Sequence, residues 1–158
     1  KGNQWHFGIK AHVGVDTQSG LVHTVITTAA NVSDISQTPA LLHGQEEEVG
    51  ADAGYVGVEK REDMKAALAT NEQEVKWRIA KRRKTVQKMA EGWQKSLAQA
   101  YEKLKAKIRA RVEHPFHIIK NIFKHKKARY KGIAKNNVQL NMLFGLSNLY
   151  MARGKLRP

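Results

Sequence analysis

The sequence predicts a mixed α/β domain in which helices cover a sheet. Three observations support this fold class. Apolar and polar residues alternate through WHFGIKAHVGVD, residues 5–16, with the period of a half-buried strand. The following LVHTVITTAA, residues 21–30, is rich in β-branched residues that favour strands. From Thr85 onward the pattern becomes helical, so the chain must combine strands with helices.

The first two strands are expected to form an antiparallel hairpin. The linking segment DTQSG is a turn, opened by Asp16 and closed by Gly20, which can adopt a positive φ. Alternation gives the first strand an apolar face and a polar face. The apolar face comprises Phe7, Ile9, Ala11, Val13 and Val15, and the polar face comprises His6, Lys10 and His12.

The remaining elements are predicted in the order helix, strand, helix, strand, helix, helix. NVSDISQTPALLHG starts a helix with Ser33 or Asp34 as its N-cap and Gly44 as its stop signal. EVGADAGY is a short strand and its exit, residues 58–69 form a helix, and EVKWRIAKRR is a basic strand. Residues 85–127 form two helical pieces, and NNVQLNMLFGLSNLYMARGKL is an apolar closing helix.

A single domain over residues 1–158 is expected, because no repeat or low-complexity linker interrupts the chain. The composition, 41% apolar and 27% charged, suits a globular protein. No apolar run is long enough to cross a bilayer, and the absence of cysteine excludes disulfides and thiolate metal sites. A cytoplasmic location is therefore predicted.

Charge is distributed very unevenly along the chain. Residues 1–75 contain 5 basic and 11 acidic residues, whereas residues 76–158 contain 23 basic and 3 acidic residues. A half this basic repels itself unless it faces a polyanion, and nucleic acid is the leading partner. A solvated helical surface, or an RNA-binding or ribosome-associated protein, would show the same charge.

The segment KIRARVEHPFHIIKNIFKHKK, residues 107–127, predicts a helix with two distinct faces. At about 100° per residue, one sector contains the apolar residues Ile108, Val112, Phe116, Ile119 and Phe123. The neighbouring sector contains Arg109, Glu113, His117, Lys120 and Lys124. Glu113 is thus the single acid on a basic face beside the core, although an ordinary ion pair with Arg109 would also explain it.

A second carboxylate, Asp52, stands between small residues at the end of the predicted short strand. A carboxylate at a strand end and another on a flanking helix can share Mg²⁺ or Mn²⁺, which prefer oxygen ligands. Lysine and arginine around such a pair suit metal-assisted phosphoryl transfer on a nucleic-acid backbone. We therefore predict that Asp52 and Glu113 are catalytic residues and metal ligands.

Four segments closely resemble bacterial insertion-sequence transposases of the Asp-Asp-Glu type, in the group named after insertion sequence five. They are WHFGIKAHVGVD, TTAANVSDISQTPALLHG, ADAGYVGVEKRE, and RARVEHPFHIIKNIF with the following RYKGIAKNNVQLNMLFGLSNLYMAR. The resemblance covers essentially the whole chain but only the later part of such a transposase. The last catalytic helix of the wider family carries Tyr, two residues, Arg, three residues, Glu, six residues, Lys. Arg109, Glu113 and Lys120 meet that spacing, and Ala106 replaces the tyrosine.

The resemblance implies a ribonuclease H-like fold, a mixed sheet flanked by helices. Asp52 would be the second catalytic carboxylate and Glu113 the third, with Arg109 and Lys120 contacting phosphates or transposon-end DNA beside the metals. The first catalytic aspartate of the family lies on the first strand, upstream of GNQWHFG. This chain is therefore expected to lack that strand and to be a truncated form, inactive by itself.

The function implied by the resemblance is DNA transposition. Two Mg²⁺ or Mn²⁺ ions would support cleavage at insertion-sequence ends and strand transfer into target DNA. The expected partner is double-stranded DNA, bound by a homo-oligomer associated with the bacterial nucleoid, with no nucleotide cofactor and no membrane. The alternative is a catalytically inactive remnant that only binds DNA.

Two basic clusters add candidate DNA contacts, because Lys and Arg supply sequence-independent affinity for phosphate. The first is KRRK, formed by Lys81, Arg82, Arg83 and Lys84; a solvated basic loop would explain it equally well. The second begins at Lys124 and continues through Lys126, Lys127, Arg129 and Lys131.

Overall fold

The computed structural model describes residues 8–69, 74–81 and 83–155. The chain divides into two compact units, one formed by Lys1–Leu41 with Val112–Pro158 and the other by Leu42–Arg111. Both units contain strands and helices, which confirms the α/β class. None of the described helices is both long enough and apolar enough to span a bilayer. The single domain over residues 1–158 stays a prediction.

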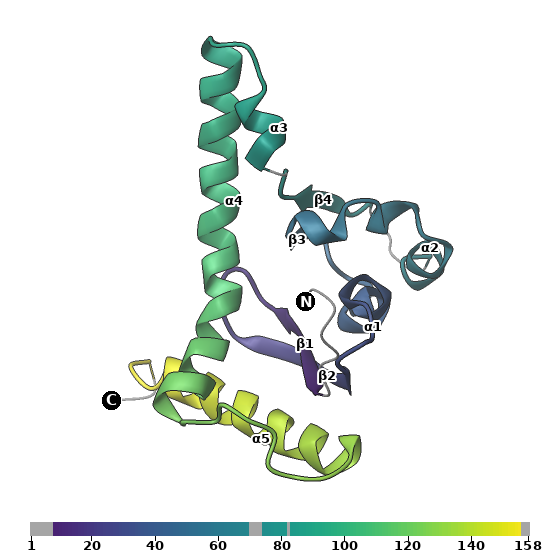
Figure 1. Cartoon of the computed structure of the whole chain (residues 1–158), viewed down its shortest axis with the longest axis vertical. Coiled ribbons are helices and arrows are strands. Elements are labelled where there is room, and N and C mark those ends of the chain that lie inside the picture. Colours follow the sequence, from purple (N-terminus) through teal and green to yellow (C-terminus); the bar gives the residue numbers. More distant parts are fainter. Residues whose placement is uncertain (1–7, 70–73, 82, 156–158) are drawn as a thin grey trace. The chain divides into compact units, whose positions relative to one another are not determined.

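The first unit is built on the predicted antiparallel hairpin of β1 (Ile9–Val15) and β2 (Val22–Ala29) (Figure 1). In its turn, the Ser19 amide donates to the Asp16 carboxylate at 2.7 Å, and Gly20 has φ 76°. The register shifts between Gly14 and Val15, which marks a bulge at this end of the hairpin. The predictions for His6 and Phe7 lie outside the described residues.

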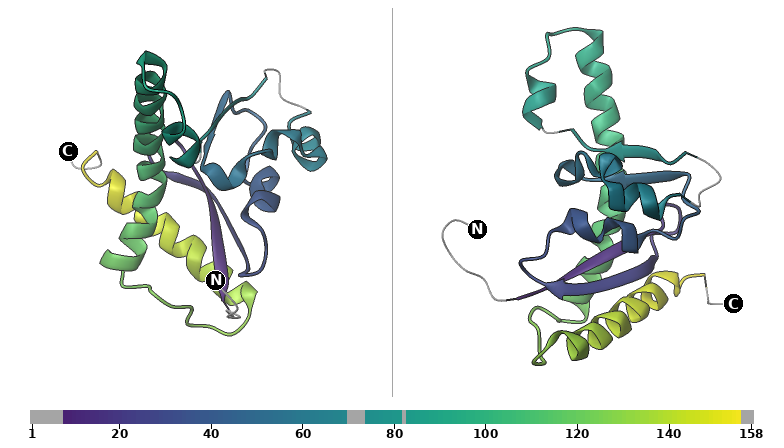
Figure 2. Two further views of the ribbon diagram at one scale, coloured as in Figure 1. Left: turned by 45° about the horizontal axis from the view of Figure 1, so that its top comes forward. Right: turned by 90° about the vertical axis from the view of Figure 1, so that its right-hand side faces the viewer.

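One face of the hairpin packs against α5 (Ile133–Ala152), which runs along it in both views of Figure 2. Ala11, Val13 and Val15 face this core, so the alternation predicted for β1 is confirmed. The ring of Phe144 meets Phe116 edge to face, with 5.2 Å between their centroids. The core combines buried Val22, Ile119 and Phe144 with half-buried Ala11, Val13, Val15, Val25, Phe116, Phe123, Leu140 and Leu143.

The Asn148 side chain ties α5 to the bulged end of the hairpin. The amide N–H of Val22 donates to Asn148 Oδ1 at 2.9 Å, and Asn148 Nδ2 donates to the Val22 carbonyl at 2.7 Å. This side chain therefore satisfies both backbone groups of one strand residue, as a neighbouring strand would.

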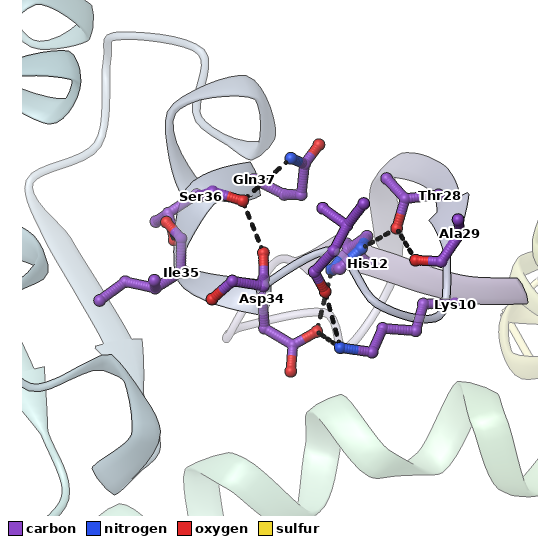
Figure 3. A network of polar contacts seen from close by, with 11 residues as sticks. Lys10, His12, Thr28, Ala29, Asp34, Ile35, Ser36 and Gln37 are labelled. Atoms are coloured by element: carbon purple, nitrogen blue, oxygen red, sulfur yellow. Dashed lines mark hydrogen bonds and ion pairs between the residues drawn. The ribbon is translucent and has the colours of Figure 1, made fainter. Parts of the chain in front are cut away.

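The other face of the hairpin carries a polar network with the segment that follows β2 (Figure 3). Lys10 Nζ donates to the Val32 carbonyl at 2.8 Å and lies 3.3 Å from Asp34 Oδ1. His12 is 5% exposed, with Nδ1 3.2 Å from Asp34 Oδ1 and Nε2 2.7 Å from Thr28 Oγ1. The polar side chains of β1 thus hold the start of the next element against the sheet.

The helix predicted in residues 31–44 is much shorter than expected. It consists of a 3₁₀ turn, η1 (Asp34–Gln37), and a single helical turn, α1 (Thr38–Leu41). Ser33 takes the N-cap position of η1 without a side-chain cap bond. The Asp34 carboxylate does not cap either, because it is used by Lys10 and His12.

The second unit contains a parallel strand pair, β3 (Glu48–Ala51) and β4 (Lys76–Ile79). The two sheets of the described residues are therefore two-stranded and separate, and the single ribonuclease H-like mixed sheet stays a prediction. The 3₁₀ turns η2 (Ala53–Tyr55) and η3 (Val58–Lys60) and the helix α2 (Glu62–Ala67) follow β3. The helix predicted over residues 58–69 is interrupted at Arg61, whose backbone is extended.

The helical region predicted from Thr85 comprises α3 (Arg83–Gln87) and α4 (Trp93–His117), two pieces as expected. Its end was predicted wrongly. Helix α4 continues past Pro115 but gives way to the π-helix η4 (Ile118–Ile122), closed by the Phe123 N–H on the Ile118 carbonyl at 3.0 Å. Lys124 then takes φ 58°, which ends the helix instead of extending it to residue 127.

Phe144→Ala is expected to destabilise the protein by about 3–4 kcal/mol, because it removes a fully buried ring and leaves a cavity against Phe116. Met142→Ala is the matched control on the same helix, since Met142 is 64% exposed. Urea unfolding midpoints measure both changes. Equal, small losses for the two variants would contradict the assignment of this core.

His12 should make stability depend on pH. The pKa of His12 is lowered, mainly because the ring is buried. The negative charge of Asp34 raises this pKa but does not offset the burial, and the positive charge of Lys10 lowers it further. The folded state therefore favours the neutral ring, and the stability this gives is complete above the unfolded pKa of about 6.5 and is lost as pH falls below it. We expect wild type to lose more stability than His12→Asn between about pH 7.5 and pH 5.

The control for this experiment is His43→Asn, which replaces a histidine whose side chain is 56% exposed. It should retain the pH dependence of the wild type. If His12→Asn also retains it, the buried ring does not change its protonation on folding.

Candidate active site

Asp52 lies immediately after β3, at the position predicted from the sequence. Its Oδ1 accepts a hydrogen bond from the Gly54 amide at 2.7 Å, and its carbonyl accepts one from the Tyr55 amide at 3.1 Å. The side chain is exposed and caps the short turn η2. The carboxylate is therefore held in a defined orientation at the strand end while it stays open to solvent.

Two glycines permit this turn. A Cβ on Gly54 would lie 3.0 Å from Asp52 Oδ1, which is too close for the carboxylate to keep its position. Gly57 has φ 90°, a conformation that favours glycine. Both glycines therefore belong to the exit of the chain after Asp52.

The strands beside Asp52 are held by polar contacts with α4. Arg78 on β4 donates to the Tyr101 hydroxyl at 2.7 Å and pairs with Glu48 on β3. Lys105 Nζ donates to the carbonyl of Ile79 at 2.8 Å and to Glu102 Oε1 at 2.9 Å. These contacts fix the end of β4 at the same edge of the pair as Asp52, because the strands are parallel.

Tyr101, Glu102 and Lys105 were not singled out from the sequence. A signal was present, because Glu102 is one of only three acids after residue 75, in the same kind of basic surroundings as Glu113. A lone acid in a basic helix can serve a structural contact as readily as a catalytic one. Here Glu102 Oε2 accepts the Lys81 amide at 3.1 Å.

Glu113 is exposed on α4, in the part of this helix that belongs to the first unit. It lines an open depression of about 430 Å³ together with Phe116, His117 and Lys120. The Lys120 ammonium lies over the Phe116 ring, 5.7 Å from its centroid. A carboxylate and a cation thus share one small surface.

The orientation of this surface follows from the buried side of the same segment. Ile118 and Ile119 are 0% and 3% exposed, and Pro115 is also buried. His117 Nδ1 is hydrogen-bonded to the Asn121 side-chain amide at 2.9 Å, and its ring stacks on that of His114 at 6.3 Å. Because this buried side faces the core, Glu113, His117 and Lys120 lie on the opposite, exposed side of the segment.

The two sectors predicted for residues 107–127 are found with one correction. Phe116, Ile119 and Phe123 belong to the core of the first unit. Ile108 instead lies beside β3, where a Cβ added at Gly50 would be 3.9 Å from its Cγ2. Arg109 is exposed like Glu113. Lys124 does not continue the sector, because η4 changes the helical period and Lys124 lies beyond the helix end.

The KRRK cluster is only partly described. Lys81 is exposed and follows β4, and its backbone amide is held by Glu102. Arg82 lies outside the described residues. Arg83 and Lys84 begin α3, and their side chains lie outside the described part of the structure.

Asp52 and Glu113 belong to different units, so their pairing stays a prediction. Within residues 8–69, 74–81 and 83–155, no group of three histidine or acidic side chains is close enough to hold a metal ion. The two carboxylates themselves are oxygen donors, the type that Mg²⁺ and Mn²⁺ accept.

Comparison with known proteins identifies the family. A family model described as a transposase DDE domain matches residues 1–149. No solved structure is a significant match to the chain. The matched region includes Asp52, Glu113 and every basic residue assigned above to the candidate site. Because this match covers nearly the whole sequence, the chain belongs to the transposase DDE domain family.

Proposed function

We propose that this chain is the catalytic part of a DNA transposase of the group named after insertion sequence five. In this proposal it cleaves DNA at the ends of a bacterial insertion sequence and transfers the freed strand to target DNA. The observation that carries the proposal is the match of the transposase family model over residues 1–149. A ribonuclease H-like arrangement of the strands is part of the same proposal.

Asp52 and Glu113 are the proposed catalytic carboxylates, the second and third of the family's three. Their local positions support the assignment, since Asp52 is oriented at a strand end by Gly54 and Glu113 is exposed beside Lys120. No residue of the chain is assigned the role of the first aspartate. The proposal therefore requires a third oxygen ligand in the active protein.

Mg²⁺ or Mn²⁺ is the proposed cofactor, because both assigned ligands are carboxylates. When bound, such ions activate a water or hydroxyl oxygen and neutralise charge on the scissile phosphate. Basic residues of the chain would hold the scissile phosphate beside the bound ions. Lys120 and Arg109 are proposed to contact phosphate oxygens, because their spacing from Glu113 matches the motif of the family's last catalytic helix. The Lys120 ammonium lies over the Phe116 ring.

Double-stranded DNA is the proposed partner, and a homo-oligomer on DNA the proposed assembly. The formal net charge of +14 supports a polyanionic partner. Further phosphate contacts are proposed at five basic residues, because Lys and Arg supply sequence-independent affinity for phosphate: Lys81, Arg82, Arg83, Lys84 and Lys124.

The direct test is metal-dependent nicking of supercoiled DNA by the protein that contains this chain. Asp52→Asn and Glu113→Gln should each lower the nicking rate in Mn²⁺ by at least about a hundredfold, since even outer-shell partners of a metal contribute about 10–100-fold. Both variants should still bind DNA, because neither removes a positive charge.

The matched controls are Asp63→Asn and Glu62→Gln on α2, which remove one acid each from an exposed helix where Asp63 pairs with Arg61 and Glu62 with Lys65. Their nicking rates should stay at the wild-type level. DNA binding without any metal-dependent nicking in the wild type would contradict the enzyme and favour the DNA-binding remnant.

Gly54→Ala tests the orientation of Asp52. The new Cβ would sit 3.0 Å from Oδ1, so the carboxylate would have to shift slightly from its present orientation, and catalysis is sensitive to the orientation of reacting groups. We expect a loss of nicking with an unchanged melting temperature. Gly145→Ala is the control, because a Cβ there meets nothing within 4 Å; equal activity of the two variants would show that Gly54 does not position Asp52.

A further inference from the structure

The segment 124–131, here called the basic loop, connects η4 to α5. Five of its eight residues are Lys or Arg, and the sequence contains no acidic residue after Glu113. Every residue of the loop except His125 is exposed. The loop is therefore a concentrated positive surface with no acid near it in the sequence to neutralise it.

The loop has a defined shape because both of its ends are fixed. Lys124 and Gly132, at the start of the loop and directly after it, have the positive φ values 58° and 84°. The His125 amide donates to the carbonyl of Ile119 at 3.0 Å, which ties the first turn to the end of η4. Lys124 thus occupies a left-handed position that favours glycine.

The second end of the loop is held by a buried asparagine. Asn136 is 2% exposed, and its Nδ2 donates to the Tyr130 carbonyl at 2.7 Å and to the Gly132 carbonyl at 2.6 Å. Both hydrogen bonds are accepted by backbone carbonyls, one within the basic loop and one at Gly132, directly after it. A buried polar side chain used in this way fixes one backbone conformation.

We propose that the basic loop binds the phosphate backbone of double-stranded DNA and that Asn136 is the residue that positions it. Fixed cations lose less conformational freedom on binding than cations on a flexible loop, so the anchoring increases affinity. The inference rests on the proposed function only for the choice of DNA as the polyanion. It assigns binding to a surface that contains neither of the proposed catalytic carboxylates.

The test is the salt dependence of binding to a short duplex of arbitrary sequence, followed by fluorescence anisotropy. The triple variant Lys126→Gln, Lys127→Gln, Arg129→Gln changes only exposed residues. The slope of log affinity against log salt should fall by about 0.9 for each phosphate that the variant no longer neutralises, and by about 2.7 if all three residues bind phosphates.

A matched triple variant removes the same charge from the second unit. Lys60→Gln, Lys65→Gln and Lys88→Gln also replace exposed lysines, and the salt slope should stay within about 0.5 of the wild type, which is less than the change expected for one phosphate. Equal slopes for the two triple variants would overturn the inference, because the weaker binding would then reflect net charge alone.

Asn136→Ala tests the positioning role without removing a charge. We expect its salt slope to fall by about 0.9, the value for one phosphate, whereas Asn141→Ala, which removes a bond to the Asn137 carbonyl within α5, should not change it. A wild-type slope in folded Asn136→Ala would overturn the role of Asn136.

If Asn136→Ala does not fold, Asn136→Gln is the second variant, because it keeps the amide donor. It should recover both the fold and the wild-type salt slope. A folded Asn136→Gln variant whose salt slope stays below that of the wild type would contradict the role of Asn136.

The outcome is separable from that of the proposed function. Loop-dependent duplex binding without metal-dependent nicking would support this inference and contradict the enzyme. Nicking that requires Asp52 and Glu113, with a salt slope that the loop variant does not change, would support the enzyme and contradict this inference. Absence of salt-dependent duplex binding in the wild type would overturn the inference.

Discussion

The packing of Phe116 against Phe144 determines which side of α4 faces solvent near Glu113. The two rings meet edge to face at 5.2 Å, and Ile118 and Ile119 are buried next to Phe116 in sequence. The segment is amphipathic, so packing its apolar side against the core leaves its polar side in solvent. The exposure of Glu113, His117 and Lys120 is therefore a consequence of the core, and the candidate site depends on it.

Asp52 is positioned by a different kind of constraint. Hydrogen bonds position Asp52, whereas apolar packing positions Glu113. The Gly54 amide orients the Asp52 carboxylate, and Arg78 and Lys105 join β4 to α4. Such polar contacts tolerate exposure, and the Asp52 side chain is exposed.

Much of this arrangement could be predicted from residue patterns. The alternation through Ala11, Val13 and Val15 gave a correct hairpin face, and the apolar spacing of Phe116, Ile119 and Phe123 gave a correct core face. Both patterns are local and have a fixed period, which is why they can be read from one sequence.

Features that depend on contacts distant in sequence were not predictable in this way. The burial of His12 depends on Asp34, which the sequence suggested as a helix cap. The end of α4 was missed for a local reason, because the π-helix η4 changes the helical period and Lys124 takes φ 58°. The proposed pairing of Asp52 with Glu113 would also require contacts distant in sequence, and no periodic pattern predicts it.

The most direct test of the account is a double-mutant cycle on Mn²⁺ affinity, measured from the electron paramagnetic resonance signal of the free ion. If the two carboxylates share a cation, Asp52→Asn and Glu113→Gln should each abolish tight binding, and the double variant should bind no more weakly than either single one. Independent, additive losses would show that the two residues bind separate ions. No change in either variant would show that they are not metal ligands, and the proposed catalytic pair would be wrong.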